Sequence, residues 1–108
     1  MVPFTERVVR IILDIPAGRV MTYGQVASAA GNSRGARQVA RILHSMSAKY
    51  ELPWHRIINA QGGISTPSDR EEKGGLQREL LEAEGVEFME NGKVDLQIYR
   101  WFPEEEFE

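Results

Sequence analysis

The sequence predicts a mainly helical domain with small β elements, an α+β fold that contains a helix-turn-helix. Apolar residues recur at helical spacing over residues 4–15, two short helical segments follow around a glycine-containing turn, and Asn91-Gly92 is typical of a tight hairpin turn. The chain has 108 residues, of which 42% are hydrophobic, and this suits one small globular domain. We therefore expect a single domain over residues 1–108, with an acidic tail over 103–108.

The first helix is predicted over residues 4–15, whose apolar side chains share one face, and the Pro-Ala-Gly run at 16–18 ends it. Thr22 starts a second helix, because its side chain can cap the helix while Gln25 reaches back in a capping box. The Gly-Asn pair at 31–32 ends this second helix after a short run.

A third helix is expected to begin from a cap at Asn32 or Ser33 and to run to about Met46. Its apolar residues recur on one side, which would face the rest of the domain. Two short helices joined by a tight turn that contains glycine are typical of a helix-turn-helix.

The second half of the chain combines short β elements with one helix. Residues 56–59 indicate a short strand, and the polar residues 65–75 indicate a loop. Residues 76–84 are predicted to be helical, with Gly85 as the stop signal. Residues 86–96 alternate apolar and polar side chains around the asparagine-glycine turn, which predicts a β-hairpin.

Charge is distributed unevenly along the chain, whose net charge is −3. Residues 1–60 carry eight basic and three acidic residues, a net charge of +5, whereas residues 61–108 carry five basic and thirteen acidic residues, a net charge of −8. A basic half favours contact with nucleic-acid phosphates, because the local field at the contact face decides binding. An unevenly charged, solvated surface is the alternative.

The composition excludes several classes of function. With no cysteine, the chain has no disulfide, thiol catalyst or thiolate metal site. His44 and His55 are the only histidines, so we expect neither a transition-metal site nor a cofactor. The apolar runs are too short to span a membrane, and charged residues within 1–20 argue against a secretory signal. We expect a cytoplasmic protein without a membrane partner.

Five sequence segments occur in an order that is seen in a known protein family. They are IPAGRV at 15–20, TYGQVA at 22–27, ARQV at 36–39, PWHRIIN at 53–59 and EGV at 84–86. Over residues 4–101 the chain resembles the C-terminal domain of O6-alkylguanine-DNA alkyltransferases. Active members have cysteine at the position of Trp54, and this cysteine takes the alkyl group off the base. Tryptophan at that position marks the alkyltransferase-like subgroup, and an indole ring offers no thiolate-like nucleophile.

The resemblance implies a winged-helix-like helix-turn-helix domain of the alkyltransferase C-terminal type, which enters the DNA minor groove and rotates a damaged guanine into a pocket. Arg37 corresponds to an arginine finger that fills the space left by the base; a phosphate-contacting or merely exposed arginine is the alternative. Tyr23 corresponds to a tyrosine that crowds the neighbouring phosphate, and a half-buried aromatic is its alternative. Small residues on the groove-facing helix allow close approach to DNA, unless they serve helix packing. The implied DNA-binding residues are Tyr23, Arg34, Gly35, Ala36, Arg37, Ala40 and Arg41.

The resemblance also implies a lesion pocket beside Trp54, whose ring offers a stacking surface; the alternative is that it plugs a disused pocket. Active members use a histidine and a glutamate to deprotonate the cysteine, so without a thiol we expect a structural hydrogen bond between His55 and Glu84. Arg56 is expected to anchor the loop through backbone carbonyls or a carboxylate. Arg70 could cover a rotated base by a cation–π contact or be a solvated loop residue. The implied pocket residues are Tyr23, Pro53, Trp54, His55, Arg56 and Arg70.

The predicted function is that of a non-enzymatic sensor of DNA damage. It would bind duplex DNA that contains O6-alkylguanine, hold the lesion as a monomer and pass it to nucleotide excision repair proteins, with the acidic residues 71–108 as a candidate docking surface. Two alternatives remain open: a repair enzyme that uses Glu84 or His55 as a base, and a helix-turn-helix protein that reads sequence. The second alternative leaves the segment 53–56 without a purpose.

Overall fold

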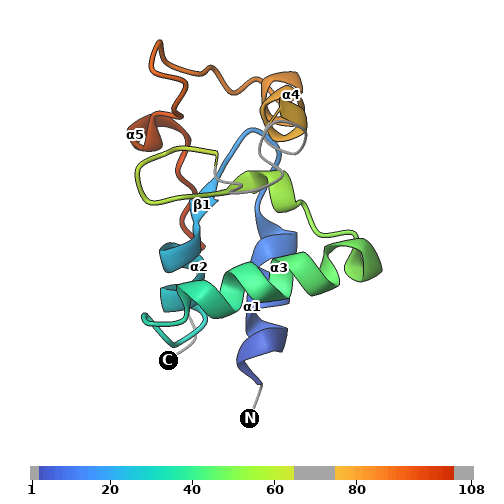
Figure 1. Cartoon of the computed structure of the whole chain (residues 1–108). Helices are drawn as coiled ribbons and strands as arrows, with labels where there is room; N and C mark the ends of the chain where they lie inside the picture. Colours follow the sequence, from blue (N-terminus) through green and yellow to red (C-terminus); the bar gives the residue numbers. More distant parts are fainter. Residues whose placement is uncertain (1–2, 65–74, 104–108) are drawn as a thin grey trace.

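The computed structural model describes residues 3–64 and 75–103, which form mainly helices and a small two-stranded sheet. This arrangement confirms the predicted fold class (Figure 1). The 3-10 helix η1 (Trp54–Arg56) precedes strand β2 (Ile57–Ile58), which pairs with β1 (Met21–Thr22). The α-helices are α1 (Phe4–Asp14), α2 (Tyr23–Ala29), α3 (Ala36–Tyr50), α4 (Gly75–Ala83) and α5 (Leu96–Tyr99).

The helices of the first half pack around one core. Ile12 of α1, Val26 of α2 and Val39 of α3 are fully buried together, because each helix turns an apolar face inward. Joined by the turn over residues 30–35, α2 and α3 form the predicted helix-turn-helix, and α3 crosses α1 (Figure 1). One face of α3 is therefore held against the core, while the opposite face is free to meet a partner.

The turn before α3 differs from the prediction. Neither Asn32 nor Ser33 caps the helix, which begins at Ala36 with Gly35 as its N-cap. The Asn32 side chain instead accepts a hydrogen bond from the Arg34 backbone N–H at 3.1 Å, and its carbonyl accepts one from the Gly35 N–H at 2.9 Å. Asn32 thus closes the turn that leads into the helix, a role for which its short polar side chain is suited.

The carboxyl end of α3 lies further along the chain than predicted. The helix continues past Met46 to Tyr50, because Met46 packs against the core and the residues after it are compatible with a helix. Glu51 then ends the helix in the left-handed region, with φ 52° and ψ 46°, and its N–H donates to the Ser47 carbonyl. This longer helix brings the chain directly to η1.

Thr22 caps α2 as predicted, but Gln25 does not complete the capping box. Thr22 Oγ1 accepts a hydrogen bond from the Gln25 backbone N–H at 3.0 Å. The Gln25 side chain instead donates to the Trp101 carbonyl at 2.6 Å, because the end of the chain runs beside β1, where the Trp101 N–H donates to the Val20 carbonyl at 2.8 Å. Gln25 therefore ties the helix-turn-helix to the C-terminal segment.

The two strands pair in parallel through the interior of the domain. Met21 lies opposite Ile57 and Thr22 opposite Ile58, and all four residues are buried. The strand predicted over 56–59 is thus confirmed as β2, whereas β1 was not predicted. The register of the pair positions η1, because η1 immediately precedes β2 in the chain.

A second apolar cluster joins α4 to the end of the chain. Leu81 of α4 is buried with Val86 and Val94. Gly85 follows α4 with φ 94°, which confirms the predicted stop signal. Within residues 3–64 and 75–103, no helix is both long and apolar enough to cross a lipid bilayer.

The hairpin predicted over residues 86–96 is reduced to one antiparallel bridge between Phe88 and Val94. The pairing stays short because the Val94 N–H donates to the Gly62 carbonyl at 2.8 Å, so Val94 is shared with another turn. A Cβ atom on Gly62 would lie 2.4 Å from the Val94 carbonyl oxygen, which explains why glycine stands there. The short helix α5, which follows the bridge, was not predicted.

Candidate nucleic-acid interface and pocket

The exposed face of α3 carries two arginines. Arg37 and Arg41 are one helical turn apart and exposed, as is Ala40, and Arg34 is exposed in the preceding turn. In the described part of the chain, none of the three guanidinium groups has an ion pair. Unpaired guanidinium groups at a surface are available to phosphate oxygens, which they bind in a bidentate geometry. The face is therefore suited electrostatically to a nucleic-acid backbone.

The small residues around the start of α3 serve different purposes. Gly35 is buried, and a Cβ atom placed on it would lie 2.8 Å from Cζ of Phe4 on α1. Glycine at this position lets the turn pack against α1, which is the packing alternative that the sequence left open. Ala36 is half-buried, whereas Ala40 is exposed and keeps the surface between the arginines flat. Contact of Gly35 and Ala36 with DNA stays a prediction.

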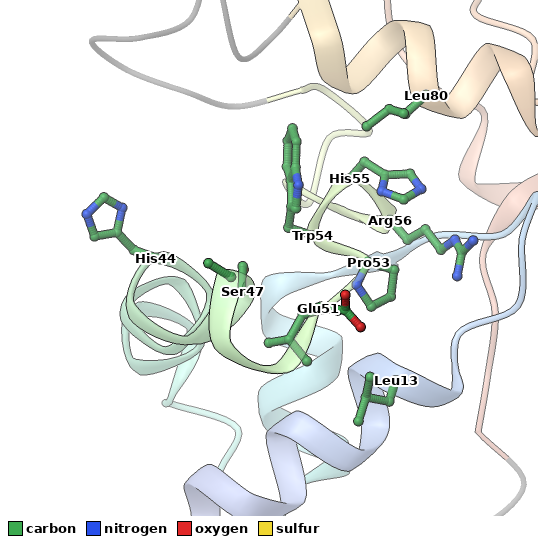
Figure 2. A pocket seen from close by; sticks show the side chains of 11 residues that line it. Leu13, His44, Ser47, Glu51, Pro53, Trp54, His55, Arg56 and Leu80 are labelled. Atoms are coloured by element: carbon green, nitrogen blue, oxygen red, sulfur yellow. The ribbon is translucent and has the colours of Figure 1, made fainter.

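An open pocket of about 810 Å³ lies beside η1, between the carboxyl end of α3 and α4 (Figure 2). Four of the residues that the sequence assigned to a pocket line it, namely Pro53, Trp54, His55 and Arg56. The structure adds lining residues that sequence reasoning missed, because their approach depends on how the helices pack. They include Leu13, His44, Ser47, Ala48, Glu51 and Leu80.

Two further residues were expected in the pocket. Arg70 lies outside the described residues. Tyr23, the first residue of α2, is half-buried against the core of α1, α2 and α3 and is not part of the pocket lining. Its packing corresponds to the half-buried aromatic that the sequence left as the alternative, and its contact with DNA stays a prediction.

Trp54 presents part of its ring to the pocket. The residue is half-buried, packs against the helical core and meets the His55 ring edge-on, with 6.1 Å between the ring centroids and 85° between the planes. Figure 2 shows the indole standing between the carboxyl end of α3 and Leu80 of α4. A flat aromatic surface in such a position can stack against a base.

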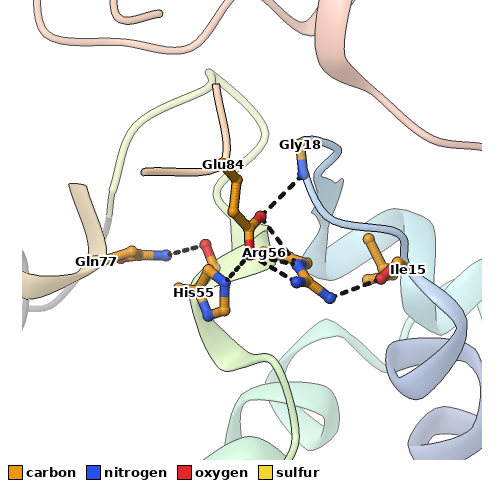
Figure 3. A network of polar contacts seen from close by, with 6 residues as sticks. All are labelled: Ile15, Gly18, His55, Arg56, Gln77 and Glu84. Atoms are coloured by element: carbon orange, nitrogen blue, oxygen red, sulfur yellow. Dashed lines mark hydrogen bonds and ion pairs between the residues drawn. The ribbon is translucent and has the colours of Figure 1, made fainter. Parts of the chain in front are cut away.

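Glu84 links three segments of the chain next to η1 (Figure 3). Its Oε2 lies 2.8 Å from His55 Nε2 and 2.6 Å from Arg56 Nη2, and its Oε1 accepts the Gly18 N–H at 2.9 Å. Arg56 Nη1 also donates to the Ile15 carbonyl at 2.9 Å. The expected hydrogen bond between His55 and Glu84 is thus present, and Arg56 uses both kinds of partner expected of it, a carboxylate and a carbonyl.

The surroundings of Glu84 keep its carboxyl group ionised. Burial alone would raise the pKa of this group, but hydrogen bonds from Arg56, Gly18 and His55 lower the pKa to about 2. A carboxylate with so low a pKa is a weak base near neutral pH. Glu84 therefore holds the pocket wall in place, which counts against a repair enzyme that uses Glu84 as its base.

Gln77 supports the pocket and was missed by sequence reasoning. Its buried side chain donates from Nε2 to the His55 carbonyl at 3.1 Å and to the Ile57 carbonyl at 2.9 Å, which fastens η1 and β2 to α4. The available signal was its position four residues before Leu81, on the apolar face of α4. A glutamine on a buried helix face needs hydrogen-bond partners, and here the backbone of the pocket supplies them.

The chemistry that the pocket offers is one of contact surfaces. The sequence holds no thiol, and within residues 3–64 and 75–103 no three His, Asp or Glu side chains gather as metal ligands would. The lining combines an aromatic ring, aliphatic side chains and a few hydrogen-bonding groups. Such a lining suits the binding of a flat, partly apolar group.

Comparison with known proteins relates most of the chain to one group. Residues 3–86 match the family described as 6-O-methylguanine DNA methyltransferase, DNA binding domain. The chain is 45% identical over 98 residues to the DNA base-flipping protein of Escherichia coli (strain K12), a match that covers 91% of this chain and 74% of that protein. It is 37% identical over 106 residues to alkyltransferase-like protein 1 of Schizosaccharomyces pombe, across 93% and 95% of the two chains.

Solved structures share the fold. The crystal structure of S. pombe Atl1 in complex with damaged DNA containing O6-carboxymethylguanine matches with a TM-score of 0.79 at 36% identity, over 93% of this chain and 95% of that chain. The Mycobacterium tuberculosis O6-methylguanine methyltransferase matches with a TM-score of 0.59 at 26% identity, over 91% of this chain and 55% of that chain. The longer methyltransferase thus contains the same fold as one part of its chain.

Proposed function

The chain belongs to the family of the 6-O-methylguanine DNA methyltransferase DNA-binding domain, and from this membership we propose that it is a non-enzymatic sensor of DNA damage. It binds duplex DNA that contains O6-alkylguanine through the minor groove, rotates the damaged base into the pocket beside Trp54 and holds it there. One observation carries the proposal. The chain has a pocket beside Trp54 whose wall is held by the hydrogen bonds that join Glu84 to His55 and Arg56, although position 54 holds tryptophan and the chain has no cysteine.

The energetics of base rotation give Trp54 its purpose. Rotating a base out of a duplex costs a few kcal/mol of stacking and pairing, and less for a damaged base that pairs poorly. Stacking on an aromatic side chain returns about 1–3 kcal/mol per base. Trp54 thereby offsets much of the cost, and the smaller cost for a damaged base provides selectivity.

The arginines of α3 and of the turn before it hold the duplex while the base is rotated. Arg34 and Arg41 bind phosphates, and Arg37 enters the stack to fill the space that the base leaves. All three are exposed, and a planar, permanently charged guanidinium suits both tasks. Affinity should therefore fall as salt concentration rises, because bound phosphates release their counterions.

Two relatives support this proposal. The E. coli relative is named a DNA base-flipping protein, and S. pombe Atl1 has been crystallised with damaged DNA containing O6-carboxymethylguanine. The identities of 45% and 37% extend over more than nine-tenths of this chain, so they include both α3 and the pocket.

The direct test uses two short duplexes of one sequence, one with guanine and the other with O6-methylguanine. We expect the damaged duplex to bind about tenfold more tightly or better, a difference of about 1.4 kcal/mol. Mass spectrometry after incubation should show an unchanged protein, because indole at position 54 cannot accept the methyl group. Equal affinity for the two duplexes, or a protein that has gained a methyl group, would contradict the proposal.

The same duplexes separate the two alternatives. A repair enzyme that uses Glu84 or His55 as a base would release free base from the damaged duplex, and chromatography of the products would detect it. A helix-turn-helix protein that reads sequence would bind according to sequence and ignore the lesion. We expect neither result.

We propose further that the protein acts as a monomer and passes the held lesion to nucleotide excision repair proteins. Glu79 and Glu82 of α4 and the nearby Glu87 are exposed, so an acidic surface lies on elements other than the basic face of α3. Reversing these three charges should abolish capture of such proteins and leave lesion binding intact. Unchanged capture would show that the acidic surface is not the docking site. Gel filtration of the purified protein tests whether it is a monomer.

A further inference from the structure

We propose that His44 is an additional contact residue of the lesion site, whose imidazole donates a hydrogen bond to a phosphate next to the rotated nucleotide. This inference rests on the proposed function. His44 is exposed on α3 and also lines the pocket beside Trp54, so it belongs to both the helix face and the pocket.

The exposed side of α3 leads from the arginines to the pocket. Arg37, Arg41, His44 and Ala48 follow one another at spacings of three or four residues, which places them along one side of the helix. Neither arginine is part of the pocket lining, whereas His44 and Ala48 are. A duplex seated on the arginines therefore meets His44 where a rotated nucleotide leaves the helix face for the pocket.

The surroundings of the His44 ring leave it available to a ligand. Within the described residues it makes no hydrogen bond, ion pair or ring contact. Figure 2 shows the ring projecting from α3, with Ser47 between it and Trp54. An imidazole carries at least one N–H donor in either protonation state, so it can donate to a phosphate oxygen at neutral pH.

The position at the rim favours the phosphate over the base as the partner. The base itself stacks on Trp54 in the proposed site, so the sugar and phosphate that follow it pass the rim where His44 stands. In an undamaged duplex that is not opened, the backbone beside this nucleotide is not drawn towards the pocket, so the phosphate does not reach the rim. His44 therefore adds to the preference for damaged DNA, unlike a contact that binds any phosphate.

Substitutions on α3 test this assignment. His44→Ala should weaken binding of the O6-methylguanine duplex about fivefold to tenfold, the loss expected for one hydrogen bond to a charged group, and change binding of the guanine duplex less than about twofold. His44→Gln, which keeps an N–H donor, should recover part of the loss. Ser45→Ala is the matched control, because Ser45 is the exposed neighbour that does not line the pocket; it should change neither affinity.

A neutral phosphate analogue identifies the partner. A methylphosphonate at one of the two phosphates that flank the lesion should weaken binding of the wild-type protein and have no further effect on His44→Ala. The assignment would be overturned if His44→Ala lost equal affinity for the damaged and undamaged duplexes. It would also be overturned if each of the two methylphosphonates weakened binding of His44→Ala as much as it weakens binding of the wild-type protein. If the wild-type protein binds the two duplexes equally well, the proposed function fails as well. If the wild-type protein prefers the damaged duplex but the His44 variants bind both duplexes as wild type does, this inference alone fails.

Discussion

Two arginines of the matched segments, Arg37 and Arg56, stand in opposite environments. Arg37 is exposed on α3 and has no ion pair within the described residues. The side chain of Arg56 is 18% exposed, lies 2.6 Å from Glu84 through Nη2 and Oε2, and also binds the Ile15 carbonyl. One guanidinium is left open to a partner, and the other fixes the shape of the pocket.

The comparison separates stability from binding. Changes around Glu84 should lower the free energy of unfolding, because that region holds α4, η1 and the segment around Gly18 together. Changes on the exposed face of α3 should lower the affinity for DNA and leave unfolding almost unchanged. A variant on the exposed face of α3 that unfolds much more easily, or a variant at Glu84 that leaves the free energy of unfolding unchanged, would contradict this comparison.

Replacing Glu84 by alanine should have the largest effect and lower the free energy of unfolding by about 3 kcal/mol, because Arg56 is left partly buried without its charge partner. The two side chains are only 16% and 18% exposed. Denaturation in urea measures the loss. Glu82→Ala is the matched control: its pair with Arg78, at 3.4 Å, is about half exposed and should be worth about 0.5 kcal/mol or less. If Glu84→Ala and Glu82→Ala lowered the free energy of unfolding by similar amounts, the region around Glu84 would have no special structural role.

The same carboxylate should make stability depend on pH. The pKa of Glu84 falls from an ordinary value of 4.5 to about 2 in the folded protein. A lowered pKa contributes stability that is complete above about pH 5 and is lost as the pH falls towards 2, up to about 3–4 kcal/mol at about 1.4 kcal/mol per pKa unit. Unfolding in urea over this range should show a shallower loss for Glu84→Gln than for wild type. Parallel curves for the two proteins would contradict the ion-pair account.

On the other side of the comparison, Arg37→Ala should weaken lesion binding by about 2 kcal/mol, or about thirtyfold, as expected for a central contact. Its free energy of unfolding should change by less than about 0.5 kcal/mol, because the side chain is exposed. Fluorescence anisotropy with the O6-methylguanine duplex measures the affinity. Arg10→Ala, an exposed arginine on α1, should cost far less. Equal losses would make Arg37 an ordinary electrostatic contact.

The smallest effect is expected where α3 ends. Glu51 adopts a left-handed conformation that glycine adopts more easily, so Glu51→Gly should raise the free energy of unfolding by about 0.5–1 kcal/mol. Ala48→Gly, in the interior of α3, should lower it by about 1 kcal/mol. Thermal unfolding of both variants checks the opposite signs. Destabilisation by Glu51→Gly would mean that the carboxylate makes a stabilising contact at the pocket.

Features that depend on neighbours in the chain were predictable. The cap at Thr22, the stop at Gly85 and the apolar face of α1 arise from residues within a few positions of one another, so the sequence displays them directly. The segment 53–56 was likewise recognisable by its matched residues. These local signals were sufficient for the fold class and for the part of the pocket wall formed by residues 53–56, whereas the other lining residues were missed.

Most features that join distant segments were not predictable, and the hydrogen bond between His55 and Glu84 was expected only through the family resemblance. The pairing of Met21 with Ile57, the hydrogen bond from Gln25 to Trp101 and the packing of Gly35 against Phe4 each connect residues far apart in the chain. No pattern within one segment reports such contacts, because each side of the contact has the same local sequence whether or not the partner is present. The capping role expected of Gln25 and the start expected for α3 were wrong for this reason.

The chemistry available to the protein was determined by the sequence alone: a tryptophan at position 54, no thiol anywhere, and a basic first half. The division of labour among its charged groups was decided by tertiary packing alone. Arg37 and Arg56 are chemically identical, and only the arrival of Glu84 from the turn after α4, with the Gly18 and Ile15 backbone, commits one of them to structure. A charge surrounded by partners stabilises the fold, and a charge left in solvent is free to bind.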